Sequence, residues 1–148
     1  MKKATFINIL AYWFIVLLVY TATDKLAHLQ AFRGMLLQSP LLQPVAGWFS
    51  LALPISELTI AALLLFPQTR LYGFYATTVA MILFTVYVGY MLAVSAHLPC
   101  SCGGVLKSMT WKQHLLFNMV CTLLAAWGLY NTEYYPDIRT SRKPAATE

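Results

Sequence analysis

Four apolar segments, each about as long as a membrane-spanning helix, constrain the fold of this chain more than any other feature of its sequence. A helix needs about 20 mainly apolar residues to cross a bilayer, and none of the four segments alternates as a strand does. Because only helices and closed barrels can span lipid, the sequence predicts an all-α integral membrane protein, a four-helix bundle. The predicted spans are residues 4–23, 45–66, 71–96 and 111–130.

The low charge of the chain excludes an ordinary soluble domain. Only 10% of the residues are charged, whereas soluble domains carry about 25%. The net charge is +5, but the lysines and arginines flank the apolar segments instead of clustering on one surface. We therefore expect membrane lipids around the protein and no nucleic-acid partner.

The distribution of basic residues predicts the orientation. If the four segments cross the membrane, six basic residues lie on the side of the termini and four lie on the other side. Cytoplasmic loops are the ones enriched in lysine and arginine, so both termini are expected in the cytoplasm and the loop before residue 111 outside. The two sets are Lys2, Lys3, Arg70, Arg139, Arg142 and Lys143, and Lys25, Arg33, Lys107 and Lys112.

The chain between the first two spans has a pattern of its own. Leu26, Leu29, Phe32 and Leu36 recur every three or four residues, which predicts an amphipathic helix in the membrane interface. A continuation of the first helix would produce the same pattern, so both interpretations remain open. Residues 1–130 are expected to form one membrane domain and residues 131–148 a polar, disordered tail.

Small residues predict where the last two spans touch. Gly89 and Ala93 are four residues apart in the third span, as are Thr122 and Ala126 in the fourth. This spacing allows helices to approach closely in lipid.

The loop between these spans contains two cysteines one residue apart, Cys100 and Cys102, followed by Gly103 and Gly104. A disulfide requires Cα atoms about 4.4–6.8 Å apart, so the backbone must bend, and glycine provides that freedom. A bridge across so small a ring is strained, and strained, exposed disulfides are the labile ones. Lys107 and the absence of nearby carboxylates favour the reactive thiolate. The pair therefore indicates a redox-active dithiol.

Two other interpretations of the cysteine pair stay open. His97, Cys100, Cys102 and His114 supply four zinc ligands, although their spacing is not that of a usual zinc site, and we expect no metal. The pair is also consistent with an inert structural disulfide on the oxidising side of the membrane. Cys121, in contrast, lies within the fourth span among apolar neighbours, where a thiol behaves as a small, unreactive hydrophobe.

Glu57 is the one acidic residue deep inside a predicted span, about 18 Å from its start at the helical rise. An ionisable group at such depth is a candidate functional residue. Lys25 is the nearest basic partner if the first two spans pack together. We expect Glu57 either to handle protons or hydrogen-bond a quinone, or to make a structural contact between helices.

Five short motifs give the chain a recognisable order: Asp24-Lys25-Leu26, Gln38-Ser39-Pro40-Leu41-Leu42, Pro54-Ile55-Ser56-Glu57-Leu58, Pro67-Gln68-Thr69-Arg70 and Cys100-Ser101-Cys102-Gly103-Gly104. In this order, over about residues 4–130, the chain resembles the MauE family of methylamine-utilisation proteins, within the DoxX-like four-helix membrane proteins. Many relatives read Cys-Gly-Cys-Phe-Gly, whereas this chain has Ser101 and Gly103 at the changed positions.

The resemblance implies a bacterial inner-membrane protein of disulfide or electron-transfer metabolism. MauE is associated with maturation of the disulfide-rich small subunit of methylamine dehydrogenase, beside a thioredoxin-like partner. Cys100, Cys102 and Glu57 would then be the functional residues of a thiol–disulfide oxidoreductase. Its partner would be a periplasmic thioredoxin-like or secreted cysteine-containing protein, with quinone as a candidate cofactor. The alternative is a non-catalytic membrane subunit with a structural disulfide, and the sequence leaves the oligomeric state open.

Overall fold

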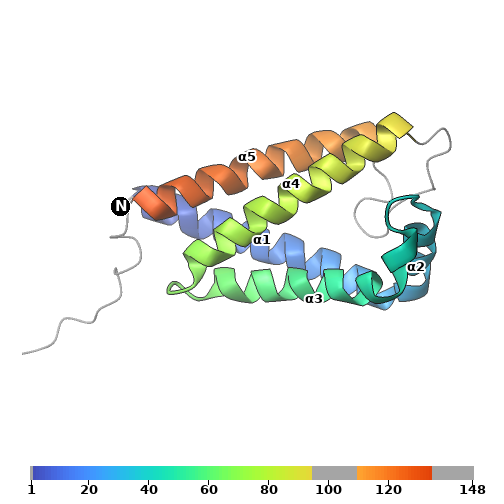
Figure 1. Cartoon of the computed structure of the whole chain (residues 1–148). Coiled ribbons are helices and arrows are strands. Elements are labelled where there is room, and N and C mark those ends of the chain that lie inside the picture. The colour runs from blue at the N-terminus through green and yellow to red at the C-terminus, as the bar shows by residue number, and fades with distance from the viewer. Residues whose placement is uncertain (1, 95–109, 135–148) are drawn as a thin grey trace, which may run out of the picture.

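A computed structural model describes residues 2–94 and 110–134 of the chain, and these residues are helical apart from short turns. Four long helices run side by side, and one short helix lies across an end of the bundle (Figure 1). For this part of the chain, the predicted all-α class and four-helix architecture are confirmed. The elements are α1 (Lys2–Ala27), α2 (Leu29–Gln38), the 3-10 helix η1 (Gln43–Val45), α3 (Ala46–Leu65), α4 (Arg70–Val94) and α5 (Trp111–Tyr134).

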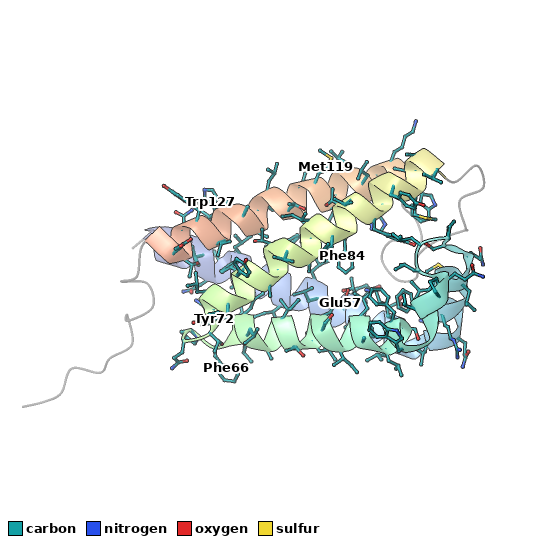
Figure 2. The ribbon with its side chains drawn as sticks, in the orientation of Figure 1. Glu57, Phe66, Tyr72, Phe84, Met119 and Trp127 are labelled. Carbon is teal, nitrogen blue, oxygen red and sulfur yellow. The ribbon has the colours of Figure 1, made fainter. Side chains whose placement is uncertain are left out.

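The four long helices are long and apolar enough to cross a membrane, as predicted. Their outer surfaces remain apolar: Val16, Val86 and Leu123 are each more than 60% exposed. Figure 2 shows Met119 and Trp127 on the outside of α5. Such surfaces suit lipid and not water, so the chain is a multi-pass membrane protein.

The last helix is longer than the sequence indicated. Helix α5 continues to Tyr134, whereas the predicted span ended at Tyr130. Asn131 and Thr132, assigned to the polar tail, are buried in the bundle, and each side chain donates a hydrogen bond to a carbonyl four residues earlier. These bonds satisfy the two side-chain donors inside the bundle, as buried polar groups require. The remainder of the predicted tail lies outside the described residues.

The segment after α1 is a separate helix, which decides between the two interpretations of its apolar pattern. At His28 the backbone leaves the helical region, with φ −114° and ψ 38°, and α2 then turns away from the axis of α1 (Figure 1). Leu36 of α2 is buried, and the Ser39 hydroxyl just after the helix lies 3.8 Å from Met91 Sδ on α4. The amphipathic helix therefore closes one end of the bundle, and its location in the membrane interface stays a prediction.

The bundle core consists of side chains from all four long helices. Phe14 and Leu18 of α1, Leu64 of α3, Phe74 of α4 and Cys121 of α5 are almost completely buried in one cluster. The most extensive helix contacts join α4 to α5 and α1 to α3. Because lipid tails are as apolar as leucine, close van der Waals packing, and not the hydrophobic effect, holds such helices together.

At the end of the bundle opposite α2, the buried side chain of Arg70 forms hydrogen bonds at the turn between α3 and α4. Arg70 Nε donates to the Leu64 carbonyl at 3.3 Å, and Arg70 Nη1 donates to Asn8 Oδ1 on α1. The carbonyls at a helix end lack partners within the helix, so the arginine satisfies one of them while joining three helices.

The predicted small-residue contact between α4 and α5 is only partly correct. Thr122 lies at the interface, where its hydroxyl is 3.1 Å from that of Thr85. Gly89, however, has open space where a Cβ would stand, and Ala93 and Ala126 are exposed. The Thr85 and Thr122 hydroxyls also donate to the Met81 and Asn118 carbonyls of their own helices at 2.7 Å, so their contact is a polar approach between α4 and α5. A closer approach occurs at Gly128 of α5, where a Cβ would lie 2.5 Å from the Phe74 ring of α4.

Gly73 marks a close approach of α4 to α3 and provides a test of the packing. A Cβ at Gly73 would lie 2.9 Å from the backbone nitrogen and from the side chain of Leu64. We expect Gly73→Ala to lower the free energy of unfolding by about 1–3 kcal/mol, as overpacking does. Gly89→Ala in the same helix is the matched control and should be neutral or slightly stabilising. Thermal unfolding in detergent measures both, and equal melting temperatures would contradict the close approach.

Candidate functional site

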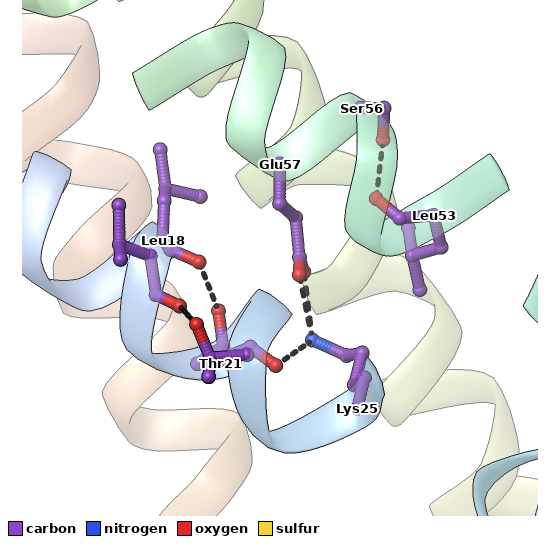
Figure 3. Close-up of polar contacts among 8 residues, drawn as sticks. Leu18, Thr21, Lys25, Leu53, Ser56 and Glu57 are labelled. Atoms are coloured by element: carbon purple, nitrogen blue, oxygen red, sulfur yellow. Dashed lines mark hydrogen bonds and ion pairs between the residues drawn. The ribbon is translucent and has the colours of Figure 1, made fainter. Parts of the chain in front are cut away.

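A buried ion pair joins α1 and α3. Lys25 Nζ lies 2.8 Å from Glu57 Oε1 and 2.9 Å from Oε2, and it also donates to the Thr21 carbonyl at 3.4 Å (Figure 3). The Glu57 side chain is 2% exposed and that of Lys25 is 21% exposed. The predicted pairing of Glu57 with Lys25 is thus confirmed, while a role of Glu57 in chemistry stays a prediction.

Local helix geometry explains how the two side chains meet. Side chains on a helix lean toward its N-terminus, so Lys25 reaches back one turn, past Thr21, into the bundle (Figure 3). On α3, Pro54, Glu57 and Ala61 are all buried and, being three and four residues apart, share one helix face. The carboxylate therefore projects from the inner face of α3, where Lys25 of α1 pairs with it.

A cavity of about 540 Å³ lies beside this pair, between the four long helices and α2. Its volume falls within the range of small-molecule sites, about 300–1,000 Å³. Figure 2 shows Glu57 and Phe84 facing the space between α3 and α4. The walls are mainly apolar, and the aromatic rings among them belong to Phe32, Phe49, Phe84, Tyr87, Trp111 and Phe117.

One face of α5 contributes the polar groups opposite the ion pair. His114 and Asn118, one helical turn apart, both line the cavity. The Trp111 ring stacks on that of His114, with centroids 6.4 Å apart and planes 16° from parallel. Asn118 is 5% exposed, and its Nδ2 has no hydrogen-bond partner among the residues that the structure describes. A buried amide N–H is costly to leave unsatisfied.

Asn118 is not among the residues predicted from the sequence, and His114 is predicted there as an alternative zinc ligand beside the cysteines. The available signal was a polar residue in an apolar span, four residues after a histidine. That spacing alone does not show whether the helix face points to lipid, to a neighbour or to a cavity.

The predicted cysteine pair lies outside the described residues, in the segment 95–109. The chain enters this segment from α4 and leaves it just before α5, at the α2 end of the bundle (Figure 1). Trp111, the first residue of α5, lines the cavity. The C-terminus of α4 and the N-terminus of α5 therefore both lie at the α2 end of the bundle, where Trp111 and α2 line the cavity.

Three ligands of the alternative zinc site, His97, Cys100 and Cys102, lie in the same segment outside the described residues. Within residues 2–94 and 110–134, no three histidine, cysteine or acidic side chains come together as metal ligands do. Cys121 is fully buried in the core and unpaired there, as expected for a thiol within a span.

Comparison with known proteins identifies the family of this chain. No curated protein matches the chain significantly, and no solved structure does. A family model described as methylamine utilisation protein MauE matches residues 3–131. The matched region contains nearly all of the four long helices, the ion pair and every residue that lines the cavity. This multi-pass membrane protein belongs to the MauE family.

Proposed function

We propose that the chain is a thiol–disulfide exchange protein of the bacterial inner membrane, similar in type to DoxX-like proteins, with Cys100 and Cys102 as its redox pair. Both termini would lie in the cytoplasm, and the cysteine segment would face the periplasm. Its partner would be a thioredoxin-like or secreted cysteine-containing protein of methylamine utilisation, the process for which the family is named.

The exchange would proceed through a mixed disulfide. The thiolate of one cysteine attacks a disulfide of the partner, one partner sulfur leaves as a thiolate, and the second cysteine then displaces the other. The Cys100–Cys102 bond forms, the partner disulfide breaks, and two electrons and two protons pass to the partner. The same steps in reverse oxidise a partner dithiol.

The single observation that carries this proposal is the spacing of Cys100 and Cys102 within a segment without acidic residues. No aspartate or glutamate occurs between Glu57 and Glu133, while Lys107 and Lys112 follow the pair. Positive charge without nearby carboxylates lowers the cost of forming a thiolate.

Chain entropy argues against a structural role for the disulfide. Closing a ring across a single intervening residue stabilises a protein by only about 1.5 kcal/mol in the chain-entropy relation, compared with about 3 kcal/mol for a 15-residue loop. A structural disulfide between positions 100 and 102 would therefore constrain the unfolded chain very little. Chemistry is the stronger reason to place two cysteines at this spacing.

Trapping the partner tests the proposed function. Cys100→Ser or Cys102→Ser leaves one cysteine that can attack but none to resolve the mixed disulfide, so at least one variant should accumulate a covalent complex. On non-reducing gels of intact bacterial cells, we expect an additional band of higher mass that contains this protein and a thioredoxin-like or secreted protein. Dithiothreitol should remove the band.

Cys121→Ser is the matched control for this experiment, since the fully buried Cys121 thiol should not contribute to the complex. Introducing it into both single variants should leave the trapped band unchanged. If neither variant traps a protein, and the pair stays oxidised in cells at all times, the chain is instead a membrane subunit with an inert disulfide.

A further inference from the structure

One residue that lines the cavity carries a buried hydrogen-bond donor without a partner among the described residues. Asn118 is 95% buried, lines the cavity, and its Nδ2 lacks a partner in the described part of the chain. In contrast, Asn131, also buried in α5, donates to the Trp127 carbonyl at 2.8 Å. Asn118 lines the cavity although its Nδ2 atom is itself buried, so a small turn of the amide is enough to present this unused N–H to an acceptor oxygen in the cavity.

The other polar groups of the cavity restrict what that ligand is. The donors of Lys25 are engaged by Glu57 and by the Thr21 carbonyl. The pair is neutral as a whole, so it offers no net charge to an ion. With mainly apolar walls, the site suits an uncharged, lipid-soluble molecule.

Aromatic side chains favour a flat ring as the body of the ligand. Phe84, Phe117 and Trp111 come from α4 and α5 and line the same space as Asn118. Aromatic rings pack well in offset or edge-on arrangements at centroid separations of about 4.5–7 Å. The terminal torsion of asparagine is soft, so its amide can turn an N–H toward a carbonyl oxygen on such a ring.

We propose that the cavity binds a quinone, with Asn118 Nδ2 donating a hydrogen bond to a quinone carbonyl oxygen. This inference rests on the proposed function for its chemical purpose, because a dithiol that becomes a disulfide must release two electrons. A quinone accepts them: the two thiols lose two electrons and two protons and form the S–S bond, and both carbonyls become the hydroxyls of a quinol. The binding itself involves only described residues.

Direct binding of a short-chain quinone tests the site. Full-length protein in phospholipid nanodiscs is titrated with decylubiquinone. Two signals report binding: quenching of tryptophan fluorescence, because Trp111 lines the cavity, and a rise in the melting temperature. We expect saturable binding by the wild type and a dissociation constant three- to tenfold higher for Asn118→Leu, the value of one lost hydrogen bond. Asn131→Leu is the matched control and should bind as the wild type does.

The melting temperature of the ligand-free protein adds a second readout. Since Asn118→Leu removes an unsatisfied buried donor, its ligand-free form should melt at or above the wild-type temperature, whereas Asn131→Leu breaks a formed hydrogen bond and should melt lower. If Asn118→Leu does not fold, Asn118→Ala replaces it in both measurements. A wild-type dissociation constant in the Asn118 variant, or no saturable binding to the wild type, overturns the site.

A lipid ester also presents a carbonyl oxygen, and a separate arm distinguishes it from a quinone. Methyl decanoate has the same tail length and a carbonyl but no ring; if it competes as well as decylubiquinone, the quinone assignment is wrong. The variant with both Cys100→Ser and Cys102→Ser should still bind quinone normally. Quinone binding without partner trapping would refute the proposed function and support the quinone site. Partner trapping without quinone binding would support the proposed function and refute the quinone site.

Discussion

Replacing Lys25 with methionine is expected to lower the free energy of unfolding by about 3–5 kcal/mol, the usual cost of removing one partner from a buried ion pair. The loss is large because Glu57 stays behind with its side chain only 2% exposed. No other basic side chain of the described residues lies within ion-pair distance of it. Unfolding of the detergent-solubilised protein, monitored by tryptophan fluorescence, measures the change.

The reciprocal substitution, Glu57→Leu, should cost less than Lys25→Met. Lys25 is 21% exposed and lies two residues before the end of α1, so its flexible chain can carry the ammonium toward the polar boundary of the membrane. The double variant, Lys25→Met with Glu57→Leu, should be close to the wild type or more stable, because an apolar pair needs no desolvation of charge. The exposed Lys112 supplies the control: Lys112→Met should change stability by less than about 0.5 kcal/mol. Additive losses in the double variant would contradict the pairing.

The same double variant separates the two interpretations of Glu57. If the ion pair only joins α1 to α3, a stable double variant should keep its thiol exchange. If Glu57 handles protons beside the cavity, the double variant should fold normally but exchange slowly. Folding and activity therefore respond together in the first case and independently in the second.

The ion pair could be predicted from sequence because the physics leaves few solutions. A carboxylate about 18 Å along a membrane span at the helical rise must be neutralised or paired, and few basic residues lie close enough to a neighbouring span. Lys25 was the nearest of them. The same reasoning predicted four helices, since lipid requires every backbone hydrogen bond to be satisfied within the segment.

The cavity could not be predicted in this way, because it depends on how five helices are placed around one another. Asn118 is one polar residue in an apolar span, and only tertiary packing shows that its face meets α2, α3 and α4 across a space. Helix contacts have the same limit. Gly73 and Gly89 occur in one helix, yet only Gly73 touches its neighbour, because Leu64 of α3 passes on that side.

The largest effect of all is expected from replacing both Cys100 and Cys102 with serine. A serine hydroxyl remains protonated and forms no disulfide, whereas exchange requires a thiolate, so redox cycling of the protein should fall to the uncatalysed background. Stability should change by no more than about 1.5 kcal/mol, the limit set by the short ring. Loss of chemistry without loss of folding is the signature of a redox pair.

Alkylation with a mass tag during equilibration in glutathione buffers measures this outcome. In a Cys121→Ser background, the protein should switch between two tagged thiols and none at a potential above about −300 mV, because structural disulfides titrate below that value. The double serine variant should carry no tag at any potential, and its melting temperature should match the background protein. Two outcomes would show that the sulfurs serve structure alone: a pair that resists reduction down to about −300 mV, or full biological function in the double serine variant. The function of this bundle would then depend on its cavity.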